Sequence, residues 1–207
     1  MRTAAILPLY KQEGDKYVFK GSGFFLTEEL LATAWHVIRN GGRFALIGEH
    51  YIELEVLFKA TPEQNGADFA VCSLSTAAHF HSLKLESTVP PKGIICQVKG
   101  FLRNRESGAV ESQIFECIME QEHPYGRENM LRFQGHAGKT NQGKMQGMSG
   151  GPIINSEGKV VGLLSSGGRP DMPVTGFPDV EIYAVPAYAL ERYLSNYPND
   201  DHPAASL

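Results

Sequence analysis

Residues 147–152 read Gly-Met-Ser-Gly-Gly-Pro, which places a serine among glycines directly before an apolar segment. Glycines on both sides of Ser149 allow backbone conformations closed to other residues, so that N–H groups can converge on an oxyanion beside the hydroxyl. An ordinary glycine-rich hairpin turn has the same composition. The segment alone leaves both interpretations open, and its neighbours in the sequence must decide between them.

The surrounding sequence has the spacing of β-strands. Its apolar runs are short, rich in β-branched and aromatic residues, and separated by Gly, Pro and Asn. We predict strands at 4–10, 17–26, 30–35, 43–47, 51–59 and 69–74 and, after Pro90-Pro91, at 93–98, 110–119, 130–134, 152–154, 160–165 and 182–185. Helical periodicity is convincing only at 187–197. These two sets of short strands indicate an all-β sandwich or barrel that a helix closes.

Two residues upstream fit a catalytic role for the serine. His36 lies at the end of the predicted strand 30–35, and Asp68, the only aspartate between His36 and Ser149, opens the apolar run 69–74. A weak hydroxyl nucleophile needs a general base, and the base needs a carboxylate that fixes its tautomer and stabilises the imidazolium. Each residue alone has a structural explanation, but the three together indicate one catalytic unit.

Two other chemistries are weaker. The serine motif also fits the Gly-x-Ser-x-Gly nucleophile elbow of α/β-hydrolases, which run in the order serine, acid, histidine. Here the only histidine after Ser149 is His202 in a polar tail, and the helices that alternate with strands in a parallel sheet are missing. A metal site at His79 and His81 lacks a third ligand at a suitable spacing, so we predict no metal.

Charge and cysteine usage restrict the partners and the compartment. The 207 residues carry a net charge of −4, which supplies no drive toward nucleic acid or anionic membranes. Three cysteines without C-x-x-C spacing favour a reducing environment. The apolar stretch at the N-terminus is interrupted by Pro8 and Lys11, too early for a signal peptide or membrane helix. We therefore expect a cytoplasmic protein with neither nucleic acid nor membrane as a partner.

Five segments, in order, resemble the chymotrypsin-fold serine peptidases, nearest to the bacterial trypsin-like domains of the HtrA group. Residues 33–36 match the family's Thr-Ala-x-His, residues 68–71 its Asp-Ile/Phe-Ala-Val, and residues 147–152 its Gly-x-Ser-Gly-Gly-Pro. Residues 160–165 and 183–186 are similar to strands that flank the substrate cleft. The resemblance covers residues 3–195 and implies two six-stranded antiparallel β-barrels with the active site between them.

The domain boundaries and the site follow from this resemblance. The N-terminal barrel would span 1–89 and carry His36 and Asp68, the C-terminal barrel 90–186 with Ser149, and a helix with a polar tail 187–207. The resemblance implies that His36 is the general base, Asp68 its orienting partner and Ser149 the nucleophile. The backbone N–H groups of Gly147 and Ser149 would form the oxyanion hole, and no cofactor is required.

Substrate selectivity is the least determined property. The resemblance implies that residues 143–146 form one wall of the primary specificity pocket. This segment contains no aspartate at the position that selects Lys or Arg in trypsin. Glu181 on the opposite wall would attract a basic side chain of the substrate, whereas Lys144 would favour an acidic one. If Glu181 and Lys144 paired, their charges would neutralise each other. The sequence is equally compatible with Glu181 as a plain surface residue. Residues 165–179, rich in Gly and Pro, are predicted to form a loop that borders the cleft. The predicted substrate-binding residues are Gly143, Lys144, Ser165, Ser166, Gly167 and Glu181.

Two residues depart from the family pattern. Met148 stands where secreted trypsin-like enzymes carry an aspartate that captures a new N-terminal ammonium, and a thioether cannot form that ion pair, so we predict no zymogen processing of this kind. Trp35 places a large ring next to the predicted base, where it either shapes or obstructs the site.

The leading hypothesis is a serine endopeptidase that hydrolyses protein or peptide substrates through an acyl-enzyme. The alternatives are a catalytically silent binding or scaffold domain, and an enzyme that stays dormant until a regulatory protein or a fused sensor domain activates it. All three triad residues are present, which favours the enzyme.

Overall fold

The computed structural model describes residues 5–62, 67–74, 80–104, 106–125, 128–136, 145, 147–168 and 179–196. Its first half is one closed antiparallel barrel with the strand order β1-β2-β3-β6-β5-β4. The strands are β1 (Ile6–Glu13), β2 (Lys16–Phe25), β3 (Leu30–Thr33), β4 (Phe44–Ile47), β5 (His50–Ala60) and β6 (Phe69–Leu74). A short helix, α1 (Trp35–Arg39), interrupts the strands between β3 and β4.

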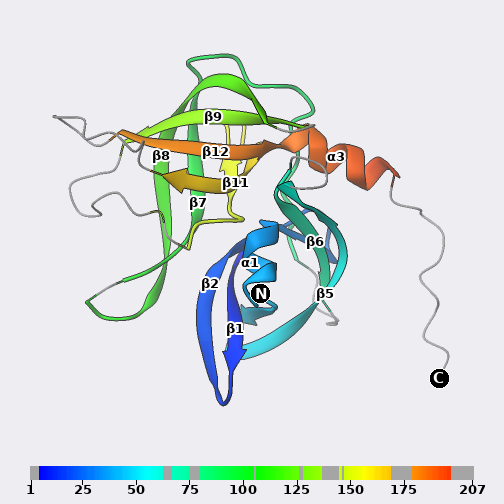
Figure 1. Cartoon of the computed structure of the whole chain (residues 1–207), viewed down its shortest axis with the longest axis vertical. Helices are drawn as coiled ribbons and strands as arrows, with labels where there is room; N and C mark the ends of the chain where they lie inside the picture. The colour runs from blue at the N-terminus through cyan, green and yellow to red at the C-terminus, as the bar shows by residue number, and fades with distance from the viewer. Residues whose placement is uncertain are drawn as a thin grey trace.

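The second half is another closed antiparallel barrel, with the order β10-β11-β12-β9-β8-β7. Its strands are β7 (Ile95–Arg103), β8 (Val110–Tyr125), β9 (Glu128–His136), β10 (Pro152–Ile154), β11 (Val160–Gly168) and β12 (Asp179–Pro186), and α3 (Ala187–Asn196) follows. Figure 1 shows the first barrel, blue to cyan, below the second, green to orange. The predicted fold, two six-stranded antiparallel barrels and a closing helix, is confirmed. The predicted domain boundaries stay a prediction.

Several element predictions need correction. The strand predicted at 30–35 ends at Thr33, and His36 lies in α1 rather than at a strand end. The helix forms there because the adjacent Val37 and Ile38 are both buried, whereas neighbouring residues of a strand point to opposite sides. Strand β8 continues past the predicted end at 119 through a register shift between Met119 and Gln121. The loop predicted at 165–179 is strand over 165–168, and residues 169–178 lie outside the described residues.

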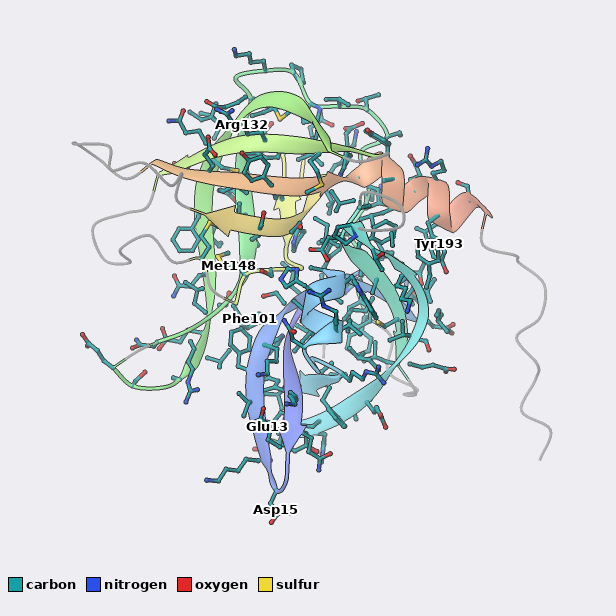
Figure 2. All side chains as sticks on the ribbon, in the orientation of Figure 1. Glu13, Asp15, Phe101, Arg132, Met148 and Tyr193 are labelled. Atoms are coloured by element: carbon teal, nitrogen blue, oxygen red, sulfur yellow. The ribbon has the colours of Figure 1, made fainter. Side chains whose placement is uncertain are left out.

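The barrels share a core. The larger hydrophobic cluster contains first-barrel residues such as Phe24 and Leu31 together with second-barrel residues such as Leu163 and Val185. Helix α3 joins this cluster through the buried Leu190, and its Tyr193 stacks on Phe58 of β5, with ring centroids 4.0 Å apart (Figures 1 and 2). The C-terminal helix therefore follows the second barrel in sequence and packs against the first.

The described part of the connector between the barrels, residues 80–90, contacts both of them. The Phe80 ring stacks on Phe25 of β2 with centroids 4.1 Å apart, and the Leu83 N–H donates to the Phe25 carbonyl at 2.9 Å. Further along, the Glu86 N–H donates to the carbonyl of Val160 at 2.8 Å. None of the helices in the described ranges has the length and apolarity needed to cross a bilayer.

Candidate active site

His36 and Asp68 form a closely paired unit in the first barrel. The chain is extended at Ala34 and enters α1, so that His36 stands in the first turn beside the start of β6. Asp68 Oδ2 lies 2.6 Å from His36 Nδ1, and Asp68 Oδ1 accepts the His36 backbone N–H at 3.0 Å. One carboxylate therefore holds both the ring and the main chain of the histidine, which fixes the direction of the imidazole.

Ser165 connects the second barrel to this pair by a hydrogen bond. Its hydroxyl donates to Asp68 Oδ2 at 2.7 Å, and both residues are buried, with 7% of each exposed. Burial by itself raises the pKa of Asp68, but the hydrogen bonds and charge of His36 and the Ser165 hydroxyl outweigh it, so the pKa lies below its ordinary value. Asp68 is therefore ionised at neutral pH, although it is almost enclosed.

The serine turn lies against the start of the histidine helix. Gly150 has a φ of +85°, and a Cβ there would lie 2.2 Å from the Ser22 carbonyl oxygen and 2.9 Å from the Ala34 nitrogen. The Ser149 carbonyl accepts the Ser22 N–H at 2.8 Å, and the Gly150 N–H donates to Leu164 at 2.7 Å. The chain at Ser149 is thus bracketed by the segment that leads to His36 and the strand that carries Ser165.

The peptide groups of this turn have an ordered set of partners. The Met148 N–H donates to the Met145 carbonyl at 3.1 Å, and the Met148 carbonyl accepts the Gly151 N–H at 2.8 Å. In the ranges that the structure describes, the backbone N–H groups of Gly147 and Ser149 donate to no protein acceptor. These two are the donors that the resemblance assigned to the oxyanion hole.

Met148 is a core residue of the second barrel. Its side chain is 0% exposed and packs in the cluster that includes Val98 and Phe133. Figure 2 shows the labelled Met148 close to the junction of the two barrels. An apolar side chain holds this part of the turn, where the secreted members of the resembling family use a buried ion pair.

The other predicted positions are placed as follows. Ser166 and Gly167 continue β11 opposite Tyr183 and Ile182 of β12, and Gly168 pairs with Glu181. Gly143 and Lys144 lie outside the described residues, so the Lys144–Glu181 pair stays a hypothesis.

Glu181 has partners that the sequence did not predict. The Tyr183 hydroxyl donates to Glu181 Oε2 at 3.0 Å, and Arg132 of β9 lies 3.5 Å from Glu181 Oε1 and 2.7 Å from Glu120 Oε2. Figure 2 shows the labelled Arg132 at the top of the second barrel. Sequence reasoning missed Arg132 because only the strand register places it opposite Tyr183.

Trp35 packs at the edge of the first-barrel core, and the Lys59 ammonium lies 4.8 Å from its ring centroid. The ring is therefore covered from the β5 side. Among the residues that the structure describes, no three His, Cys, Asp or Glu side chains form a candidate metal site. His79 of the metal motif considered above lies outside those residues.

Two antiparallel barrels joined around a His–Asp pair and a glycine-flanked serine define the chymotrypsin fold of serine peptidases. The model of the trypsin-like peptidase domain matches residues 21–163, and the chain belongs to this family. The family match identifies it as a trypsin-like serine peptidase. No curated protein sequence matches the chain significantly.

Solved structures show the same fold at low sequence identity. The active form of the Rv3671c protease from M. tuberculosis is 15% identical with a TM-score of 0.66, over 92% of this chain and 79% of that one. The HtrA-type protease AlgW with a decapeptide is 14% identical with a TM-score of 0.68, over 94% of this chain and 64% of that one. The MamO protease domain from Magnetospirillum magneticum is 16% identical with a TM-score of 0.64, over 91% and 95%.

Proposed function

We propose that the chain cleaves peptide bonds with Ser149 as nucleophile, His36 as general base and Asp68 as the residue that orients His36. The observation that carries the proposal is that Asp68 forms hydrogen bonds with both the ring and the backbone N–H of His36. Because Asp68 occupies the Nδ1 side of the ring, the proton of the neutral imidazole is held there and Nε2 is left as the basic nitrogen.

The proposed reaction has two halves. His36 Nε2 accepts the hydroxyl proton while Ser149 Oγ bonds to the scissile carbonyl carbon, and the resulting oxyanion lies against the Gly147 and Ser149 N–H groups. His36 then gives its proton to the leaving amine as the C–N bond breaks. Water, deprotonated by His36, attacks the acyl-enzyme and releases the carboxylic acid with Ser149 restored. Asp68 stays ionised throughout, in keeping with its lowered pKa.

An extended peptide is the substrate class that the strand edges favour. In the described part of the chain, the end of β11 at 166–168 pairs only with β12, whereas the earlier part of β11 pairs with both β10 and β12. A free edge of this kind binds an extended chain by adding it as a further strand. This supports Ser166 and Gly167 as residues that bind the substrate backbone, whereas the hydroxyl of the preceding Ser165 is bonded to Asp68.

For selectivity, we propose a preference for a basic side chain before the scissile bond. Among the described residues, Glu120 and Glu181 share one cation, Arg132, which leaves one negative charge without a described partner at the strand position next to Gly168. Glu181→Gln is expected to abolish any preference for Lys and Arg in a peptide library. An unchanged preference would make Glu181 a plain surface residue, and an acidic preference of the unaltered protein would favour Lys144 as the deciding residue.

The triad is tested by peptide-library cleavage at neutral pH together with labelling by a peptidyl organophosphonate. We expect cleavage and labelling by the unaltered protein, loss of both in Ser149→Ala, and retention of both in Ser156→Ala, a serine exposed in the turn before β11. Cleavage that survives in Ser149→Ala would overturn the assignment of the nucleophile. A folded protein that neither cleaves nor labels would favour the silent binding domain or activation by a regulatory partner.

Two further parts of the proposal concern control and location. Because Met148 is held by apolar packing, no new N-terminal ammonium is needed to form the turn. The three cysteines are free thiols, which supports work in a reducing compartment such as the cytoplasm.

A further inference from the structure

The hydroxyl of Ser22 links the two barrels at the serine turn. Ser22 lies on β2 of the first barrel and is 0% exposed. Its Oγ donates to the carbonyl of Gly147 at 2.9 Å and accepts the N–H of Phe101, on β7 of the second barrel, at 2.9 Å. The hydroxyl thus acts both as a donor and as an acceptor, and both of its partners belong to the second barrel.

The backbone of Ser22 reaches the same turn. Its N–H donates to the Ser149 carbonyl at 2.8 Å, while its own carbonyl accepts the Thr33 hydroxyl at 2.7 Å. One residue therefore holds the carbonyl groups of both Gly147 and Ser149. These are the two residues whose N–H groups, in the described ranges, have no protein acceptor.

The two peptide groups on either side of the peptide between Met148 and Ser149 are in this way tied at both ends. The peptide between Gly147 and Met148 is held by Ser22 Oγ at its carbonyl and by Met145 at its N–H. The peptide between Ser149 and Gly150 is held by the Ser22 N–H at its carbonyl and by Leu164 at its N–H. A peptide group that cannot rotate fixes the direction of its neighbours, and a preorganised donor needs no reorganisation during reaction.

We propose that Ser22 is a positioning residue of the oxyanion hole, which its hydroxyl keeps formed by holding the Gly147 carbonyl across the barrel interface. The inference rests on the proposed function, because an oxyanion exists only if Ser149 attacks a carbonyl. It adds a residue from the first barrel to the geometry of the hole, so that the docking of the barrels and the competence of the hole are coupled.

Gly100 shows how closely this hydroxyl is confined. A Cβ at Gly100 of β7 would lie 2.9 Å from Ser22 Oγ and at ordinary contact distances, 3.4 Å and 3.5 Å, from Met148. The absence of a side chain at Gly100 is what lets β7 approach Ser22. Gly100→Ala should therefore push the hydroxyl away from the Gly147 carbonyl without a severe collision elsewhere.

The first test compares Ser22→Ala with Ser73→Ala, which removes a half-buried hydroxyl from β6 of the first barrel, opposite Leu30 of β3 and Glu55 of β5. For Ser22→Ala we expect kcat per active site to fall about 10- to 100-fold with KM changed less than about 2-fold, because the lost interaction acts in the transition state. The affinity for a peptide boronic acid, which forms a tetrahedral adduct, should fall in parallel, whereas that for a product peptide should not. Ser73→Ala should change the melting temperature only slightly and leave kcat unchanged.

The second test is a double-mutant cycle. Gly100→Ala alone should lower kcat, but in the Ser22→Ala background its effect should become small, because the atom that it displaces is gone. Additive effects on kcat would mean that Gly100→Ala acts elsewhere and would contradict the proposed path.

The outcomes separate this inference from the proposed function. If the unaltered protein labels and cleaves through Ser149 and Ser22→Ala keeps its kcat and its boronate affinity, Ser22 is only structural and the proposed function stands. If Ser22→Ala loses stability alone, the conclusion is the same. If Ser149 is not labelled by the organophosphonate, the proposed function and this inference fail together.

Discussion

At the scale of single residues, Asp68 has the most closely defined surroundings in the site. It accepts hydrogen bonds from the ring and backbone of His36 and from Ser165, so its partners rather than its burial decide its charge. A carboxylate enclosed in this way keeps its charge only while these donors stay in place, and the two residue-scale predictions remove the carboxylate and one donor in turn.

Asp68→Asn is expected to lower kcat about 10⁴-fold, the size seen when a triad carboxylate becomes an amide and the histidine takes the wrong tautomer. It should also change acid stability. Because the folded pKa of Asp68 lies below its unfolded value of about 3.9, the ionised side chain stabilises the fold above about pH 4, and this contribution is lost as the pH falls through the folded pKa. Urea unfolding between acid and neutral pH should show the two proteins converging in stability at low pH. A constant difference would contradict the linkage.

Ser165→Ala is expected to cost about 2 kcal/mol of unfolding free energy, because a buried carboxylate loses a hydrogen bond. The pKa of Asp68 should rise, since one of the groups that lower it is gone. Ser166→Ala, at the next and exposed position of β11, is the matched control and should change stability by less than about 0.5 kcal/mol. Equal effects of the two substitutions on denaturant midpoints would show that Asp68 does not depend on Ser165.

At the scale of elements, the serine turn depends on close approach between backbones. Gly150 combines a positive φ with a neighbouring carbonyl oxygen that leaves no room for a Cβ, whereas Gly158, in the turn between β10 and β11, has a φ of +78° and nothing within 4 Å. The two glycines share the conformation and differ in the space around them.

Gly158→Ala should therefore cost only the strain of a left-handed conformation, about 1–2 kcal/mol, and leave catalysis intact. Gly150→Ala should cost more than about 4 kcal/mol and abolish cleavage, because the turn must move away from Ser22 and Ala34. Chemical denaturation and peptide cleavage measure both effects. Similar costs at the two positions would mean that conformation rather than space dictates glycine in the serine turn.

At the scale of the whole molecule, the barrels are joined through several separate contacts. The shared cluster, the connector at Phe80, the stacking of Tyr193 on Phe58 and the Ser22 hydroxyl all cross from one half to the other. We therefore expect the halves to unfold in one cooperative transition.

The single tryptophan, Trp35, reports on the first barrel. Phe133→Ala, in the core of the second barrel, should remove about 3–5 kcal/mol of stability. It should shift the Trp35 fluorescence transition as far as the circular dichroism transition. Ile114→Ala, on the same barrel but with 56% of the residue exposed, should shift neither by much. A Trp35 transition that stays in place in Phe133→Ala would show that the first barrel unfolds independently.

Much of the fold and the central residues could be predicted from the sequence because their signals are local. Short alternating runs predict strands, and the order of the histidine, aspartate and serine motifs indicates one catalytic unit on a particular fold. The helical position of His36 was missed because a five-residue helix after a strand is too short to show a period. The Arg132–Glu181 pair was missed because no pattern along β9 shows which strand will lie beside it.

By itself, the sequence determined the two sets of strands, the closing helix, and the identity of the histidine, aspartate and serine in the family motifs. Only the tertiary structure decided which groups surround them: Ser165 on Asp68, Arg132 on Glu181, and Ser22 on a carbonyl 125 residues away. The physical reason is range. Hydrophobic periodicity and glycine-containing turns reflect interactions between residues that are close in the chain. These hydrogen bonds join residues far apart in the chain and depend on how two closed barrels pack against each other.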